Sequence, residues 1–246
     1  MKSSEILLHG PSGRIQARLD LVEKQENTYP SIALLLHSHS SLGGSIKDPV
    51  VHTLKQILVK NGYSVLSINC KGGDSLQNYS ANNKTIKQED SEALEDAASS
   101  LDWLEKTLPS AKCICVAGFS FGSWIAMELT MRRPEVSHFI SVSPPVEKYD
   151  FAPFVRFPLR GLILQGEVDS VTEEKEVREL FRPMFDKKDS TVQYVSIEGA
   201  DHFLRGKRKE LEEITDKYLK SAIGELQENH SKVKKAKYTR NKPTAV

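Results

Sequence analysis

From about residue 30 onward, the sequence alternates between short apolar runs and longer amphipathic segments. The runs Ile32–Leu36 and Cys113–Ala117 are apolar without alternation, which is typical of strands covered on both faces of a parallel sheet. The segments between such runs place apolar residues at helical spacing, as a helix with one buried face does. This order indicates an α/β fold with a mostly parallel, twisted sheet and helices on both faces.

The first part of the chain has a different pattern. Residues Arg14 to Val22 alternate polar and apolar side chains, which indicates an antiparallel strand with one wet face. Ile6–His9 is its expected partner, joined through a turn at Pro11-Ser12-Gly13. Further strands are expected at Ser64–Cys70, Cys113–Phe119, Phe139–Ser143, Gly161–Gln165 and Thr191–Ile197, and helices at about residues 50–58, 91–108, 121–133, 173–185 and 207–226.

The length and charge of the chain limit the classes of protein to which it can belong. The chain has 246 residues, of which 39% are hydrophobic, and this is enough to bury the core of one large domain. We therefore expect a single domain over residues 1–227. A net charge of +1 argues against a nucleic-acid binder or a membrane-surface binder. Residues 228–246 carry six basic side chains and one acidic one, a net of +5 that leaves −4 for the rest. We therefore expect a basic, disordered C-terminal tail, the only part suited to contact nucleic acid.

Targeting signals and disulfides are not expected. The first ten residues lack the apolar core of a signal peptide, and no apolar run approaches the roughly 18 residues of a membrane span. The three cysteines do not form a disulfide framework, because their number is odd and Cys113 and Cys115 lie on one strand. These observations predict a cytoplasmic protein.

The apolar strand Cys113–Ala117 leads directly into the motif Gly118-Phe119-Ser120-Phe121-Gly122. An apolar-periodic helix follows it, so the chain must turn sharply at Ser120. Small residues are needed on either side, where the backbone of the strand and the helix come close. This context predicts that the Ser120 hydroxyl lies at the carboxyl edge of the sheet as a nucleophile, although a glycine-rich turn without catalysis would have the same pattern.

A base and an acid follow Ser120 in the order that such a nucleophile requires. Asp169 lies just beyond the strand Gly161–Gln165, and His202 follows the strand Thr191–Ile197. We expect His202 to accept the proton of Ser120 and Asp169 to orient the imidazole. Glu167 and Glu147 are rival acids, whereas Asp201 is expected to form a salt bridge or a turn hydrogen bond.

Two backbone N–H groups are needed to stabilise an oxyanion. The sequence predicts that Phe121 supplies one and that His39, in the loop after the strand Ile32–Leu36, supplies the other. His37 is expected to hydrogen-bond the loop backbone. We predict no metal site and no cofactor, because no third ligand pattern accompanies the two histidines and the mechanism needs only protein groups.

The chain resembles the small, lid-less bacterial α/β-hydrolases, a group of predicted esterases related to the dienelactone-hydrolase and serine-aminopeptidase-like branches. The resemblance spans about residues 5–220 and rests on several motifs besides the Ser120 motif. These include His37-x-His39 with Gly43-Gly44, Gly62-Tyr63-Ser64-Val65-Leu66, Leu94-Glu95-Asp96-Ala97-Ala98, Pro144-Pro145 with Tyr149-Asp150-Phe151, and Gly199-Ala200-Asp201-His202-Phe203. It implies an α/β-hydrolase fold without a lid domain.

Two loops depart from the pattern of that group. The group usually has His-Pro-His-Pro where this chain has His37-Ser38-His39-Ser40, and Asn-Phe-Arg-Gly where it has Asn69-Cys70-Lys71-Gly72. Losing two prolines loosens the oxyanion loop, and Lys does not replace Arg where a bidentate contact matters. These departures concern the geometry of substrate binding.

The expected substrate is a small-molecule ester. Only about a dozen residues separate Pro145 from Leu159, which is too few for a helical lid, so we expect an open site. Phe119, Phe151 and Phe154, with Phe121 and Phe157, are predicted to line an apolar rim for the substrate, although Phe119 and Phe121 are equally compatible with packing beneath the turn.

The sequence favours a serine hydrolase that cleaves a carboxylic ester or thioester through an acyl-Ser120 intermediate. A peptidase or amidase of the same fold is an alternative, as is a non-catalytic binding or scaffold protein that retains the fold. The sequence does not determine the oligomeric state.

Overall fold

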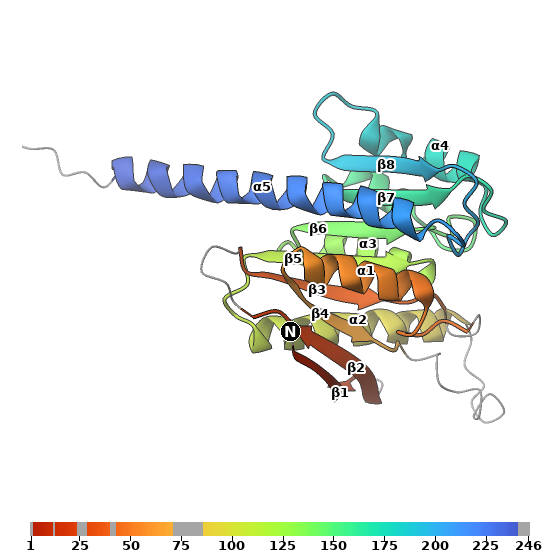
Figure 1. Cartoon of the computed structure of the whole chain (residues 1–246), viewed down its shortest axis with the longest axis horizontal. Coiled ribbons are helices and arrows are strands. Elements are labelled where there is room, and N and C mark those ends of the chain that lie inside the picture. The colour runs from red at the N-terminus through yellow and green to blue at the C-terminus, as the bar shows by residue number, and fades with distance from the viewer. Residues whose placement is uncertain (1, 12, 24–28, 40–42, 71–85, 241–246) are drawn as a thin grey trace, which may run out of the picture.

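A computed structural model describes residues 2–11, 13–23, 29–39, 43–70 and 86–240 (Figure 1). The strands are β1 (Lys2–Gly10), β2 (Gly13–Leu21), β3 (Ser31–Leu36), β4 (Tyr63–Ile68), β5 (Cys113–Phe119), β6 (His138–Val142), β7 (Gly161–Gly166) and β8 (Val192–Ile197). The α-helices are α1 (Pro49–Lys60), α2 (Ile86–Thr107), α3 (Phe121–Arg132), α4 (Glu174–Phe185) and α5 (Arg208–Arg240), and a short 3-10 helix, η3, spans Ala152–Arg156.

The strands form one eight-stranded sheet in the order β1-β2-β4-β3-β5-β6-β7-β8. β1 pairs with β2 and β2 with β4 in antiparallel orientation, and all the remaining pairs are parallel. β3 and β5 lie side by side in the middle of the sheet, so the loops that follow them meet at one edge. The predicted fold class is confirmed.

Helices cover both faces of the sheet (Figure 1). α1 and α5 pack on one face, where Leu54 and Leu219 join the core. α2, α3 and α4 pack on the other face. β3 to β7 are buried along their whole length, as the unbroken apolar runs of β3 and β5 predict for those two strands. β2 buries its alternate apolar residues Ile15, Ala17 and Leu19, together with Asp20.

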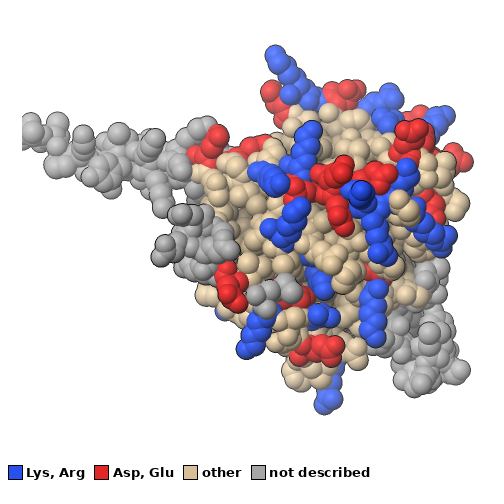
Figure 2. Space-filling model, in the orientation of Figure 1, with Lys and Arg blue, Asp and Glu red and all other residues tan. Residues whose placement is uncertain are grey.

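No lid domain is inserted between β6 and β7, where every residue is described. The chain forms only η3 there, as the short spacing predicts. Within the part of the chain that the structure describes, no helix combines the length and the apolar character needed to cross a membrane. On the face that carries α1 and α5, basic and acidic side chains are interspersed (Figure 2).

The C-terminal segment differs from the expectation. The sequence predicts a helix that ends near residue 226 and an unstructured tail beyond it, but α5 is helical to Arg240. The apolar residues that pack α5 onto the sheet end near Leu226, and the prediction followed that pattern. Residues 228–240 contain no proline or glycine, so nothing in them interrupts the helix before Pro243. Residues 241–246 lie outside the described residues.

His138 is a buried titratable group at the start of β6. Its side chain is fully buried, and its Nε2 lies 2.9 Å from the hydroxyl of Tyr63. Burial, assisted by the charge of Arg160, lowers the pKa of His138 from 6.5 to about 3. The folded protein therefore keeps this imidazole neutral at pH values where the unfolded chain is protonated, so stability is lost as the pH falls below 6.5.

This titration predicts a measurable pH dependence of stability. Between pH 7 and pH 5, His138 should account for about 2 kcal/mol of the fall in the free energy of unfolding. The free energy of unfolding of His138→Gln, measured with urea at pH 7 and pH 5, should fall by about 2 kcal/mol less than that of the wild type. His9→Gln, on the exposed part of β1, should behave like the wild type. An unchanged pH dependence in His138→Gln would contradict this account.

Candidate active site

Ser120 occupies the sharp turn between β5 and α3. Its φ of 52° and ψ of −118° lie in a region that residues other than glycine rarely adopt. Hydrogen bonds hold the turn, because the Ser120 N–H donates to the carbonyl of Val142 and the Ser123 N–H donates to the carbonyl of Ser120. Such a conformation persists only where the surrounding structure enforces it, and it is found most often at functional sites.

Close backbone contacts explain both glycines of the motif. A Cβ atom on Gly118 would lie 2.0 Å from the carbonyl oxygen of Gly122. A Cβ atom on Gly122 would lie 2.6 Å from the carbonyl oxygen of Leu36, on β3. The prediction that small residues must flank the turn is confirmed.

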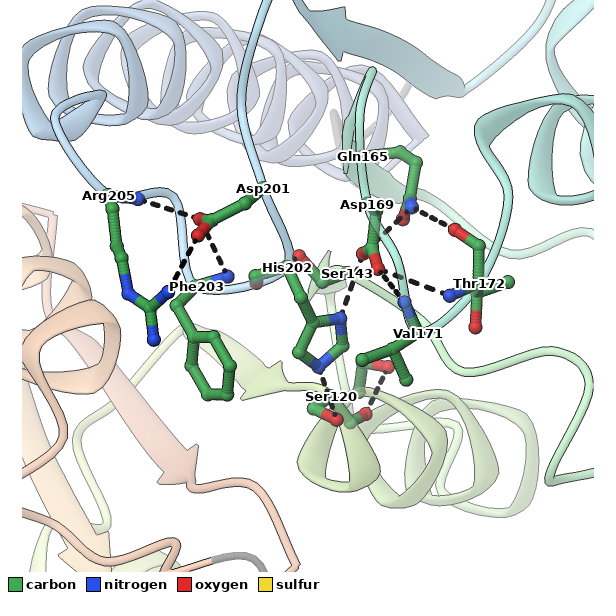
Figure 3. Close-up of polar contacts among 11 residues, drawn as sticks. Ser120, Ser143, Gln165, Asp169, Val171, Thr172, Asp201, His202, Phe203 and Arg205 are labelled. Atoms are coloured by element: carbon green, nitrogen blue, oxygen red, sulfur yellow. Dashed lines mark hydrogen bonds and ion pairs between the residues drawn. The ribbon is translucent and has the colours of Figure 1, made fainter.

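Ser120, His202 and Asp169 form one chain of hydrogen bonds (Figure 3). The Ser120 Oγ lies 3.0 Å from His202 Nε2, and His202 Nδ1 lies 2.8 Å from Asp169 Oδ2. The side chains come from the ends of three different strands, β5, β7 and β8. All three residues are less than 10% exposed. The structure thus brings the three predicted residues together, and their catalytic roles are taken up below.

The carboxylate of Asp169 accepts several hydrogen bonds besides that of His202. Its Oδ1 accepts from the backbone N–H groups of Val171 (2.7 Å) and Thr172 (3.1 Å), and its Oδ2 accepts from Gln165 Nε2 (3.0 Å). Burial raises the pKa of Asp169, but His202 and the two backbone N–H groups outweigh it and lower the pKa below its usual value. Asp169 is therefore ionised at neutral pH and fixes the tautomer of His202 with Nδ1 protonated.

The rival acids have other partners. The Glu167 carboxylate accepts from the backbone N–H of Gly199 at 2.9 Å, and Glu147 contacts Glu176. Asp201 accepts from the backbone N–H groups of Phe203 and Arg205 and forms an ion pair with the Arg205 guanidinium. The interpretation of Asp201 as a turn and salt-bridge residue is confirmed.

Two residues that support the site were missed in the sequence. Ser143, after β6, donates from its hydroxyl to the backbone carbonyl of His202 at 3.0 Å. Gln165, on β7, is fully buried and holds Asp169 Oδ2. The one sequence signal for Gln165 is a polar residue within an apolar strand, four positions before the acid. No local pattern indicates what that amide contacts.

Gln165 should matter for turnover more than for binding. We expect Gln165→Leu to lower kcat about tenfold, because a buried hydrogen bond to a carboxylate is lost and Asp169 is held less firmly. The KM should change less than twofold. The exposed Gln193, on the neighbouring strand β8, gives the matched control Gln193→Leu, which should leave both constants unchanged. Steady-state kinetics on p-nitrophenyl acetate tests this, and an unaltered kcat in Gln165→Leu would contradict it.

The residues predicted to supply the oxyanion donors lie next to each other. The rings of His39 and Phe121 meet edge to face, with centroids 5.0 Å apart, and Phe121 directly follows Ser120. The His39 side chain is also 3.8 Å from Asp90 of α2. His37 is buried, and its Nε2 accepts the backbone N–H of Cys70, so its predicted role in holding loop backbone is confirmed.

Parts of the two loops that depart from the hydrolase pattern lie outside the described residues. These are residues 40–42 of the loop after β3 and Lys71-Gly72 of the loop after β4. Among the residues that are described, no three His, Cys, Asp or Glu side chains gather as they would around a metal ion.

The predicted substrate rim is wrong for three of its phenylalanines, whereas Phe157 is exposed. Phe119, Phe151 and Phe154 are each no more than 1% exposed. Phe151 packs against Phe154 and Phe181 of α4, because η3 turns these aromatic side chains inward. Phe119 lies under the His202 ring, at a centroid distance of 5.4 Å, and supports it. In this irregular segment no periodicity distinguishes an inward-facing aromatic residue from an outward-facing one.

Different apolar residues are exposed beside the triad. Val168, which precedes Asp169, is 58% exposed, and Phe203, which follows His202, is 38% exposed. The Phe203 ring contacts both His202 and Phe119. These two side chains, rather than the predicted phenylalanines, provide apolar surface next to the triad.

Known proteins resemble this chain in sequence and in fold. A protein of Rickettsia prowazekii (strain Madrid E), described as uncharacterized, is 39% identical over 219 residues, which cover 87% of this chain and 88% of that protein. The structure of a candidate α/β hydrolase of unknown function from Agrobacterium tumefaciens is 34% identical, with a TM-score of 0.78 and coverage of 91% of this chain and 98% of that one.

A more distant structure shares the fold. An alpha-beta serine hydrolase homologue from Coxiella burnetii is 27% identical, with a TM-score of 0.74, and the match covers 88% of this chain and 97% of that one. The sequence model of the alpha/beta hydrolase domain matches residues 31–230, which include Ser120, Asp169 and His202. The chain therefore belongs to the alpha/beta hydrolase domain family.

Proposed function

We propose that this protein is a serine hydrolase that cleaves a carboxylic ester or thioester through an acyl-Ser120 intermediate. The observation that carries the proposal is the unbroken hydrogen-bond chain from Ser120 through His202 to Asp169. A serine hydroxyl becomes an effective nucleophile when a neighbouring base accepts its proton, and His202 Nε2 lies at the distance that this transfer requires.

The reaction follows from these positions. As Ser120 Oγ attacks the carbonyl carbon, its proton moves to His202 Nε2, and the imidazolium is stabilised by ionised Asp169. The negative charge that develops on the carbonyl oxygen is stabilised by the backbone N–H groups of Phe121 and His39. His202 then donates its proton to the leaving oxygen or sulfur, and the acyl group stays on Ser120. Water, activated by His202, hydrolyses this acyl-enzyme and restores Ser120.

Burst kinetics and active-site labelling test the proposal. The protein should release a rapid burst of p-nitrophenol from p-nitrophenyl acetate, close to one equivalent, because acylation is faster than hydrolysis of an acetyl-serine. It should also be labelled by a fluorophosphonate probe. Ser120→Ala should lose both the burst and the label, whereas Ser110→Ala, on an exposed loop, should keep both. If folded wild-type protein shows neither signal, the proposal is wrong.

A further inference from the structure

A groove of about 990 Å³ opens between the start of α1 and the segment that leads from Phe203 into α5. The residues that line it include Asp48, Pro49, Phe203, Arg205, Arg208 and Lys209. Phe203 is its link to the triad, because this residue follows His202 and its ring lies 5.2 Å from the imidazole, centroid to centroid. In Figure 3, Phe203 and Arg205 lie on one side of His202 and Asp169 lies on the other.

The electrostatics of Asp48 also connect the groove with the triad. Burial raises the pKa of the Asp48 carboxyl, whereas backbone N–H groups of α1 and then the charges of His202 and Arg208 act in the opposite direction. Asp48, in the lining of the groove, is therefore close enough to His202 for the charge of one to affect the other. A molecule that fills this space would touch both the triad side and the α5 side.

The chemistry of the proposed reaction decides which part of a substrate belongs there. The carbonyl oxygen must face Phe121 and His39, while His202 must deliver its proton to the leaving atom. The leaving group therefore lies on the His202 side of the scissile bond. Phe203, whose ring contacts the His202 ring, lines the groove, so a leaving group held on the His202 side can extend into it.

The groove is lined by three basic residues, Arg205, Arg208 and Lys209, and three acidic ones, Asp48, Glu210 and Glu213, so selection of an anion depends on which of these charges already have partners. Among its carboxylates, Asp48 accepts the Val50 N–H at 2.7 Å as the cap of α1, and Glu210 pairs with Lys207 at 3.3 Å. Neither Arg208 nor Lys209 forms an ion pair with another residue among those described, and Glu213 is the remaining acid in the lining.

Arg208 and Lys209 also stand in the first turn of α5, where the helix dipole disfavours positive charge. An anion in the groove would offset that unfavourable placement. Phe203 offers an apolar ring surface, on which the Arg205 guanidinium stacks at 5.0 Å.

We infer that this groove binds the leaving group, and that Arg208 and Lys209 select leaving groups that carry a carboxylate or a phosphate on an apolar or aromatic body. This inference rests on the proposed serine-hydrolase function and adds a substrate class to it.

Three acetate esters with matched leaving groups test the inference. They are 4-acetoxybenzoate, 4-acetoxyphenyl phosphate and the neutral 4-acetoxybenzamide, which share the acyl group and the aromatic ring. The wild type should show a higher kcat/KM for one or both anionic esters than for the benzamide. Which anion is preferred distinguishes a carboxylate from a phosphate. Added salt should reduce the preference, because both cations are exposed.

The variant Arg208→Ala/Lys209→Ala should lower kcat/KM for the anionic esters by about tenfold. Its kcat/KM for the benzamide should stay within about twofold of the wild type. Lys217→Ala, an exposed lysine on α5 that is not among the lining residues, should change none of the three.

Each outcome has a distinct meaning. If all three esters are cleaved with the same kcat/KM, or if the double variant loses activity equally on all three, the anion selection is wrong while the serine-hydrolase proposal survives. If no ester is cleaved and Ser120 is not labelled by a fluorophosphonate, the proposed function fails, and the inference fails with it.

Discussion

Replacing His202 by alanine is expected to lower kcat for p-nitrophenyl acetate by about 10⁶-fold. In serine hydrolases with this arrangement, loss of the base alone removes nearly the whole contribution of the triad, because the serine cannot be deprotonated without it. His202 Nε2 lies 3.0 Å from Ser120 Oγ, and no other described side chain accepts a hydrogen bond from that hydroxyl. Single-turnover release of p-nitrophenol measures the effect.

The His202 variant needs a control for folding. His202 is buried and its backbone carbonyl is held by Ser143, so alanine leaves a cavity whose effect on stability must be measured by thermal unfolding. His9→Ala, on the exposed part of β1, should keep the wild-type kcat. Added imidazole should restore part of the activity of His202→Ala, because it can enter the space left by the side chain. A folded His202→Ala protein that keeps more than a tenth of the wild-type kcat would contradict the assigned role.

Replacing Gly118 by alanine is expected to destabilise the protein by about 3–4 kcal/mol, or about 10 °C in Tm. The new Cβ would lie 2.0 Å from the carbonyl oxygen of Gly122 and 2.1 Å from its carbonyl carbon. These are backbone atoms at the start of α3, so the contact can be relieved only by moving the helix away from β5. Thermal unfolding followed by circular dichroism measures the loss.

Gly224 provides the matched control for this prediction. It lies within α5, and a Cβ added there meets nothing within 4 Å. Gly224→Ala should leave the Tm unchanged or raise it slightly, because alanine is the better helix former. Equal Tm values for Gly118→Ala and the wild type would show that the turn at Ser120 can accommodate a side chain, and the close-contact explanation of the motif would then be wrong.

The elements that position Ser120 could be predicted from the sequence because they depend on local constraints. The apolar run of β5, the two glycines and the periodic helix α3 each follow from their own residues. Asp169 and His202 were predicted from chain order, since parallel strands place their following loops at one edge of the sheet. The bounds of β5 agree with the prediction, and the other elements differ by a few residues at their ends, except α5, which continues to Arg240.

Contacts between distant segments could not be predicted in the same way. Ser143 donates to the backbone carbonyl of His202, 59 residues along the chain, and nothing near Ser143 in the sequence indicates that partner. Gln165 lies only four positions before Asp169, but the sequence does not indicate that its amide contacts this carboxylate. Phe151 and Phe154 are predicted to line the rim of an open site, yet both are buried in the core beside η3. The C-terminal helix was ended where its apolar face ends, although the residues beyond remain good helix formers.

The central claim is that the Ser120 hydroxyl attacks the substrate and carries its acyl group. The most direct measurement is peptide mass spectrometry on protein that has been mixed with excess p-nitrophenyl acetate and quenched in acid within the burst. The account predicts an added acetyl group on the peptide that contains Ser120, with fragment ions that place it on that residue. An unmodified Ser120 in protein that has turned over substrate, or an acetyl group found reproducibly on a different residue as the kinetic intermediate, would contradict it.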